Sequence, residues 1–68
     1  MNKIVTIEEC LKMDDKERRK LFSDLIDNVQ SFKKAIEPCI DLAIQLGIEP
    51  AIQCSCRLVE KVTKEYAK

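Results

Sequence analysis

The chain has 68 residues, 46% of them hydrophobic, and its twelve basic and twelve acidic side chains give a formal net charge of zero. This length allows one small domain over residues 1–68, and the balanced charge lacks the basic excess typical of proteins that bind nucleic acids or anionic membranes. The chain has no histidine, so it lacks the commonest general base and a common metal ligand. It has a single glycine, which argues against a glycine-rich phosphate-binding loop. We therefore expect a non-enzymatic protein without a cofactor, a metal or a small-molecule substrate. With neither an export signal nor a membrane-spanning run, the sequence predicts a cytoplasmic location.

A short lead-in, residues 1–5, precedes a helix start signal. We expect its Ile4 and Val5 to cover apolar surface. Thr6 and Glu9 have the spacing of a capping box, in which each side chain satisfies a free backbone N–H group at the start of a helix. A helix of about two turns should follow over residues 7–13. Its expected buried side chains are Ile7, Cys10 and Leu11.

Asp14 and Asp15 mark the start of a second, much longer helix, since acidic side chains at a helix start complement its dipole. From Asp15 to Leu46 the apolar side chains keep one helical phase. Pro38 removes a backbone donor within this stretch, but it lies on the polar side and the phase is the same before and after it. We expect one helix kinked at Pro38, and the alternative is that Pro38 breaks it into two. The apolar stripe comprises Leu21, Phe22, Leu25, Ile26, Val29, Phe32, Ile36, Cys39, Ile40, Ala43 and Ile44.

Gly47 and Pro50 predict a tight turn at residues 47–49 and a last helix from Pro50 to about Ala67. A turn this short makes the last helix antiparallel to the long one. The sequence thus predicts an all-α fold, with a short N-terminal helix and an antiparallel hairpin of a long kinked helix and a C-terminal helix. It has three helices, or four if Pro38 breaks the long one. The expected facing pairs are Ile44 with Ile52, Ile40 with Cys56, Ile36 with Val59, Phe32 with Val62 or Thr63, and Val29 with Tyr66.

The two helices of this hairpin differ in length. At 1.5 Å per residue the long helix would measure about 48 Å and the last helix about 26 Å, so the start of the long helix is left uncovered. Because exposed apolar side chains are costly, we expect a protein-protein interaction module that binds another protein or a second copy through an apolar helix face. Such a module could be a regulator, inhibitor, adaptor or assembly subunit. The alternative is that the first helix and the tail cover this patch. The expected contact residues are Leu21, Phe22, Leu25 and Ile26, with Leu42 and Leu46 as a second patch.

A competing hypothesis starts from Ala43, Gly47 and Ile48. These residues resemble the helix-turn-helix of bacterial and phage repressors, where a small residue precedes the turn glycine by four positions and an apolar residue follows it. The resemblance departs at Gln53, where the motif has an apolar residue. It implies a DNA-binding regulator that uses residues 42–64 and a chain broken at Pro38, whereas the zero net charge argues against a nucleic-acid partner. The resemblance would place Gln53 and Arg57 at base edges and Lys61 and Lys64 near phosphates.

The four cysteines raise a third hypothesis, a structural metal or redox protein. Cys54 and Cys56 are two positions apart, so on a helix they point about 200° away from each other and cannot chelate one ion together. We expect reduced thiols, with Cys10, Cys39 and Cys56 packed as small hydrophobic side chains and Cys54 on the outer face. The third hypothesis requires Cys54 or Cys56 to lie beside both Cys39 and Cys10.

Overall fold

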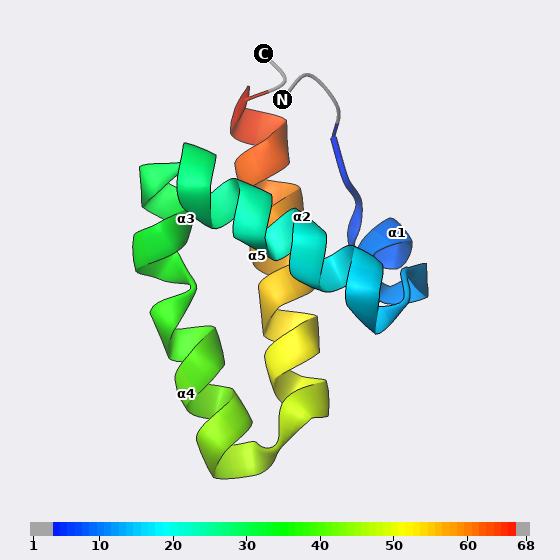
Figure 1. Cartoon of the computed structure of the whole chain (residues 1–68), viewed down its shortest axis with the longest axis vertical. Coiled ribbons are helices and arrows are strands. Elements are labelled where there is room, and N and C mark those ends of the chain that lie inside the picture. Colours follow the sequence, from blue (N-terminus) through cyan, green and yellow to red (C-terminus); the bar gives the residue numbers. More distant parts are fainter. Residues whose placement is uncertain (1–3, 67–68) are drawn as a thin grey trace.

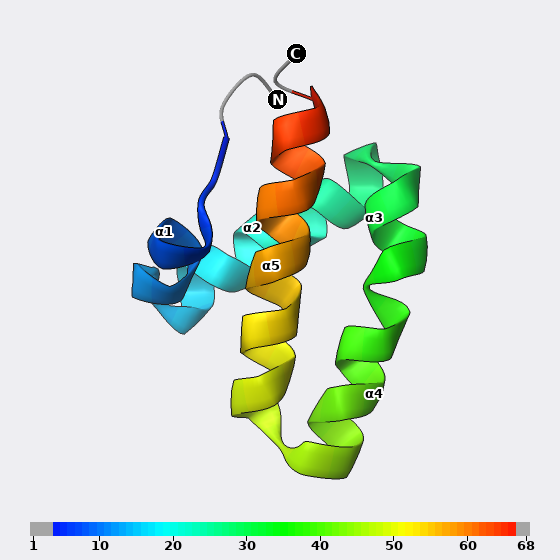
Figure 2. The ribbon, with the colours of Figure 1, turned by 180° about the vertical axis from the view of Figure 1, so that it is seen from behind.

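The computed structural model describes residues 4–66, and within this range the chain forms helices and no strand. Its helix α5 is central, because α1, α3 and α4 pack against it and α2 crosses over it (Figures 1 and 2). The predicted all-α fold and the antiparallel hairpin, formed by α4 and α5, are confirmed. Residues 1–3 of the expected lead-in and the expected helix end at Ala67 lie outside the described range. The helices are α1 (Ile7–Lys12), α2 (Asp15–Asn28), α3 (Gln30–Ala35), α4 (Glu37–Leu46) and α5 (Ile48–Tyr66).

The predicted starts of the first two helices are confirmed at atomic level, whereas α5 begins at Ile48 and not at Pro50 as expected. The Thr6 hydroxyl accepts a hydrogen bond from the Glu9 N–H at 3.2 Å, and the Glu9 carboxylate accepts one from the Thr6 N–H at 3.4 Å. The Asp14 carboxylate caps α2 by accepting from the Glu17 N–H at 2.8 Å. These local bonds satisfy backbone donors that a helix start leaves free, which explains why the sequence pattern located both starts.

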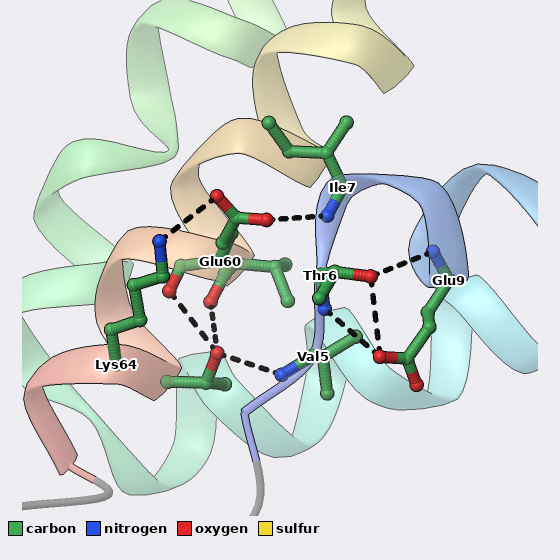
Figure 3. A network of polar contacts seen from close by, with 8 residues as sticks. Val5, Thr6, Ile7, Glu9, Glu60 and Lys64 are labelled. Atoms are coloured by element: carbon green, nitrogen blue, oxygen red, sulfur yellow. Dashed lines mark hydrogen bonds and ion pairs between the residues drawn. The ribbon is translucent and has the colours of Figure 1, made fainter.

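Two hydrogen bonds fix Val5 and Ile7, the first residue of α1, to α5 (Figure 3). The Val5 N–H donates to the Thr63 hydroxyl oxygen at 3.0 Å, and the Ile7 N–H donates to a Glu60 carboxylate oxygen at 2.9 Å. That hydrogen bond, with a smaller contribution from Lys64, lowers the pKa of the Glu60 carboxyl group. Val5 is buried as expected, whereas the expected burial of Leu11 is wrong, since this side chain is exposed on α1.

Val29 interrupts the long helix at a point that the sequence pattern did not indicate. Its backbone is extended (φ −126°, ψ 102°). The Val29 N–H donates to the Leu25 carbonyl at the end of α2. The Val29 carbonyl accepts from the N–H groups of Phe32 and Lys33 at the start of α3. The Asn28 side chain donates to the Asp24 carbonyl at 2.7 Å, a local bond that competes with helix continuation. The chain therefore turns here, and α2 lies across α5 and not in line with α3 and α4 (Figure 1).

Pro38 bends the chain without cutting it, as expected. Ile36 joins α3 to α4 in a helical conformation (φ −75°, ψ −20°), and its carbonyl accepts from the N–H groups of Cys39 and Ile40. Pro38 itself lies in the first turn of α4. Backbone N–H groups in the first turn have no acceptor within the helix, so the absence of this group in proline breaks no hydrogen bond there. Gly47 then ends α4 at φ 105°, a conformation that side chains with a Cβ atom rarely adopt.

The bend changes which side of α4 faces α5, so two predicted facing pairs are wrong. Ile40 and Ile44 were expected to oppose Cys56 and Ile52, but they are 52% and 81% exposed. The buried side of α4 instead carries Cys39, with Ala43 half-buried beside it. The side of α4 that faces α5 therefore carries smaller side chains than expected. The facing side of α5 carries the small buried residues Ala51 and Ser55, so the two helices can approach closely.

The remaining expected pairs place their members in or beside one core. Phe32 is fully buried and its ring lies 6.4 Å from the ring of Phe22. Tyr66 borders a hollow together with Val29, although its ring is half exposed. The core is small, it consists of aliphatic side chains apart from Phe32 and three cysteines, and it draws on every helix. Its buried members are Val5, Cys10, Leu25, Val29, Phe32, Ile36, Cys39, Cys56, Val59 and Val62.

Candidate interaction surface

The first predicted patch belongs largely to the core of the chain itself. Leu25 is 1% exposed, and Leu21, Phe22 and Ile26 are half-buried against the core. The expected length mismatch is therefore wrong, because it assumed a straight helix from Asp15 to Leu46. The turn at Val29 folds α2 back across α5, and this buries much of the surface that a straight helix would have left uncovered.

Among the described residues, the most exposed large apolar side chains lie on the hairpin. In the second patch, Leu42 is half-buried and Leu46 is 68% exposed. The larger part is a set of three isoleucines that we call the aliphatic strip, which comprises Ile40 and Ile44 of α4 and Ile48 at the start of α5. Ile48 is 66% exposed, so all three side chains have more than half of their surface in water.

Helix geometry places two residues of the strip on one flank of α4. Ile40 and Ile44 lie about 100° around the axis of α4 from the buried side that carries Cys39 and Ala43. The third residue, Ile48, lies beside α2, because it lines a cleft together with residues of that helix. In Figure 1, α2 passes in front of α5.

This cleft opens between α2 and the start of α5. It has a volume of about 320 Å³, and its apolar lining consists of Phe22, Ile48 and Ile52. Ile48 belongs both to the lining of the cleft and to the aliphatic strip. The polar wall of the cleft comes from the first turns of α2 and consists of Asp15, Arg18 and Arg19.

The charges around this surface are divided between two helices. On α4, Glu37 and Asp41 flank the strip, and this helix contains no basic residue. On α2, the Arg18 guanidinium donates to the backbone carbonyls of the α1 end and pairs with Asp15 at 2.6 Å. Arg19 makes no ion pair within residues 4–66, which leaves one uncompensated positive charge at the edge of the cleft.

The geometry implied by the helix-turn-helix resemblance is not present. Such motifs cross two helices at about 90–120° through a turn of three to four residues. Here α4 and α5 lie side by side and antiparallel, and Gly47 alone separates them. The four side chains proposed for DNA are all exposed on α5, with Lys64 paired to Glu60 at 3.4 Å. They are Gln53, Arg57, Lys61 and Lys64.

The cysteines form two separate pairs, both across helix contacts with α5. Burial, together with smaller contributions from a hydrogen bond and electrostatic repulsion with Cys54, raises the pKa of the Cys39 thiol to about 11. Burial likewise raises the pKa of the Cys56 thiol to about 12, with the same two contributions from Cys10. The expected outward position of Cys54 is wrong, since its side chain is half-buried beside Cys39.

This pairing does not give the arrangement that the third hypothesis required, because no thiol of α5 lies beside both Cys10 and Cys39. No group of three or more potential metal ligands comes together among residues 4–66. What the structure provides is two dithiol contacts. Nothing in the spacing of the cysteines indicated them, since they depend on how α1 and α4 pack against α5.

Comparisons with known proteins identify no relative. No protein family, no curated protein and no solved structure matches this chain. Within the described range, no helix combines the length and the apolar character needed to cross a membrane. The function must therefore be argued from the surface itself.

Sequence reasoning missed Ile40, Ile44 and Ile48 as surface residues. It assigned the first two to the hairpin contact, because the apolar phase continues through Pro38. One feature of the sequence indicated the alternative: the small residues Ala51 and Ser55 on α5 favour a close approach by small partners, whereas isoleucine would hold the helices apart.

Proposed function

We propose that this chain is a non-enzymatic protein-protein interaction module that associates with a second copy of itself. The contact joins the aliphatic strip of each copy to the cleft between α2 and α5 of the other. The observation that carries this proposal is that Ile48, one of the exposed residues of the strip, also lines the cleft. A surface that offers both exposed apolar side chains and an apolar cleft can be complementary to itself, as a two-fold interface requires.

The energetic support is the amount of apolar surface in water. Fully burying an isoleucine side chain contributes about 1.5–3 kcal/mol, and the strip offers three such side chains per copy. Isolated exposed leucines or isoleucines are normal on protein surfaces, but a contiguous group beside a cleft is typical of an interface. Leu46 extends the same surface at the end of the hairpin.

Charge supports a second copy as the partner. The strip on α4 is flanked by Glu37 and Asp41, and the cleft edge on α2 carries Arg19. When the strip of one copy enters the cleft of the other, opposite charges meet, and the two-fold symmetry repeats the contact. A partner with basic residues beside its apolar stripe would instead meet Arg19 with a like charge.

The test is the mass of the protein in solution, measured by light scattering or analytical ultracentrifugation over micromolar concentrations. We expect a dimer for the natural chain and a folded monomer for Ile44→Asp, because a buried carboxylate is strongly unfavourable. Tyr66→Asp is the control, since Tyr66 is an exposed apolar side chain like Ile44 but lies at the other end of the hairpin, at the end of α5. This variant should remain a dimer with an unchanged helical circular dichroism spectrum.

A natural chain that stays monomeric at every concentration would overturn self-association. Equal loss of the dimer in Ile44→Asp and Tyr66→Asp would instead overturn the location of the contact. Either result is clear only if both variants retain their helical spectrum, so that measurement accompanies each experiment.

A further inference from the structure

We propose that residues 4–13, which we call the strap, open from α5 as one unit while the rest of the chain stays folded. The strap consists of the lead-in and α1, and its opening brings the buried Cys10 side chain into water. The inference is independent of the proposed self-association, because Glu60 and Thr63, which hold the strap, lie outside the aliphatic strip and the cleft.

The N-terminal side of the strap is attached to α5 through two backbone N–H groups (Figure 3). The Val5 N–H donates to the Thr63 hydroxyl oxygen at 3.0 Å, and the Ile7 N–H donates to a Glu60 carboxylate oxygen at 2.9 Å. Glu60 and Thr63 are three positions apart, so they share one side of α5. Both acceptors are side chains of α5, and substitutions there can release the strap without changing its own sequence.

The C-terminal side of the strap is attached to α2. The Arg18 guanidinium donates to the carbonyls of Cys10 and Leu11 at 3.3 and 3.2 Å, and also to the carbonyl of Met13. Met13 and Asp14, which link α1 to α2, both have an extended backbone, with ψ angles of 150° and 170°. The strap thus has one end fixed at α2, and the hydrogen bonds of Val5 and Ile7 hold its other end on α5.

The strap contributes little to the core of the chain. Its buried apolar side chains are Val5 and Cys10, whereas the other eight of the ten buried core residues lie between Leu25 and Val62. The helix of the strap has six residues, too few for an isolated helix to be stable in water, so α1 depends on its contact with α5. Regions with few buried apolar contacts open at a lower free energy than the whole chain unfolds.

Alkylation of the folded, reduced full chain measures this opening. Cys10 has no exposed surface and Cys39 on α4 is 2% exposed, so each thiol reacts only after its own helix has moved. A pulse of iodoacetamide, followed by digestion and mass spectrometry, gives the rate at each thiol. Cleavage after lysine releases Cys10 within residues 4–12, and further cleavage before Asp41 separates Cys39 from the thiols of α5. Each rate is divided by that of the same thiol in the urea-unfolded chain, which removes differences in intrinsic reactivity.

The natural chain gives the first result. We expect the normalised rate of Cys10 to exceed that of Cys39 at least about tenfold, because Cys10 needs only the strap to open, whereas Cys39 needs the hairpin to separate. Equal normalised rates would overturn the inference, since both thiols would then react through unfolding of the whole chain.

Two variants test the hydrogen bonds that hold the strap. Glu60→Ala and Thr63→Val each remove one acceptor, and each should raise the Cys10 rate about five- to tenfold while the Cys39 rate stays unchanged. Lys64→Ala is the matched control on the same helix, because Lys64 is exposed and pairs with Glu60 at 3.4 Å. It should change the Cys10 rate by less than about twofold, as expected for an exposed ion pair. An unchanged Cys10 rate in both acceptor variants, or an equal rise at Cys10 and Cys39, would overturn the strap as a separately opening unit.

Discussion

Cys56 shows how one buried thiol links the packing of α1 to pH. Its side chain has no exposed surface, it lies beside Cys10, and its pKa is raised from 9.0 to about 12. The folded chain therefore keeps this proton over a range in which the unfolded chain releases it. The stabilising contribution is fully present below pH 9 and is lost as the pH rises towards 12.

This difference in pKa predicts that the free energy of unfolding falls at alkaline pH. Urea unfolding in the presence of a reductant measures this loss. Between pH 8 and about pH 10, the natural chain should lose stability with a slope of up to about 1.4 kcal/mol per pH unit for each such thiol. Cys56→Ala should be less stable at pH 8 but should show a shallower pH dependence. Identical slopes for the two proteins would contradict the assignment to Cys56.

At the scale of the helices, Val29 is the residue that decides the architecture. Its extended backbone separates α2 from α3, and it is the reason that α2 covers α5. A residue with this conformation suits the position before proline, and the N–H of Gln30, as the first residue of α3, has no partner within that helix. The break is therefore a place where the fold tolerates proline.

We accordingly predict that Gln30→Pro leaves stability unchanged or raises it by about 0.5–1 kcal/mol, because it restricts the unfolded chain. Lys33→Pro is the control, three residues further on. Its N–H donates to the Val29 carbonyl at 3.1 Å, so this variant should lose about 3 kcal/mol or more. Chemical unfolding of both variants measures the contrast. A large loss in Gln30→Pro would show that α2 and α3 behave as one continuous helix.

The helices show which features can be predicted from sequence. Helix ends could be predicted where the cause is local. The capping bonds of Thr6, Glu9 and Asp14 and the backbone angle of Gly47 involve only a few neighbouring residues, so the sequence pattern was sufficient to locate them. The break at Val29 and the rotated face of α4 depend on burial against α5. Apolar periodicity carries no information on where a helix turns back on its own chain, which is why the surface residues Ile40 and Ile44 were misplaced.

At the scale of the whole molecule, the proposed dimer has an electrostatic component that can be tested by charge exchange. Arg19→Glu should weaken association by about two- to fivefold, the range expected for an exposed ion pair. Combining it with Glu37→Arg should restore association, since the pair is re-formed with reversed signs. Arg57→Glu is the control, on the exposed side of α5. The measurement is the dimer dissociation constant at low salt, and absence of restoration in the double variant would contradict the pairing of Arg19 with Glu37.

The central position of α5 also has a consequence for synthesis on the ribosome. The helix against which α1, α3 and α4 pack is the last of the five to leave the exit tunnel. Until then, α1, α3 and α4 lack the helix against which they pack, and the Val5 N–H lacks its acceptor Thr63, 58 positions later. Stable tertiary structure therefore arises after translation of α5. A nascent chain halted before α5 is synthesised exposes its apolar segments to chaperones and proteases.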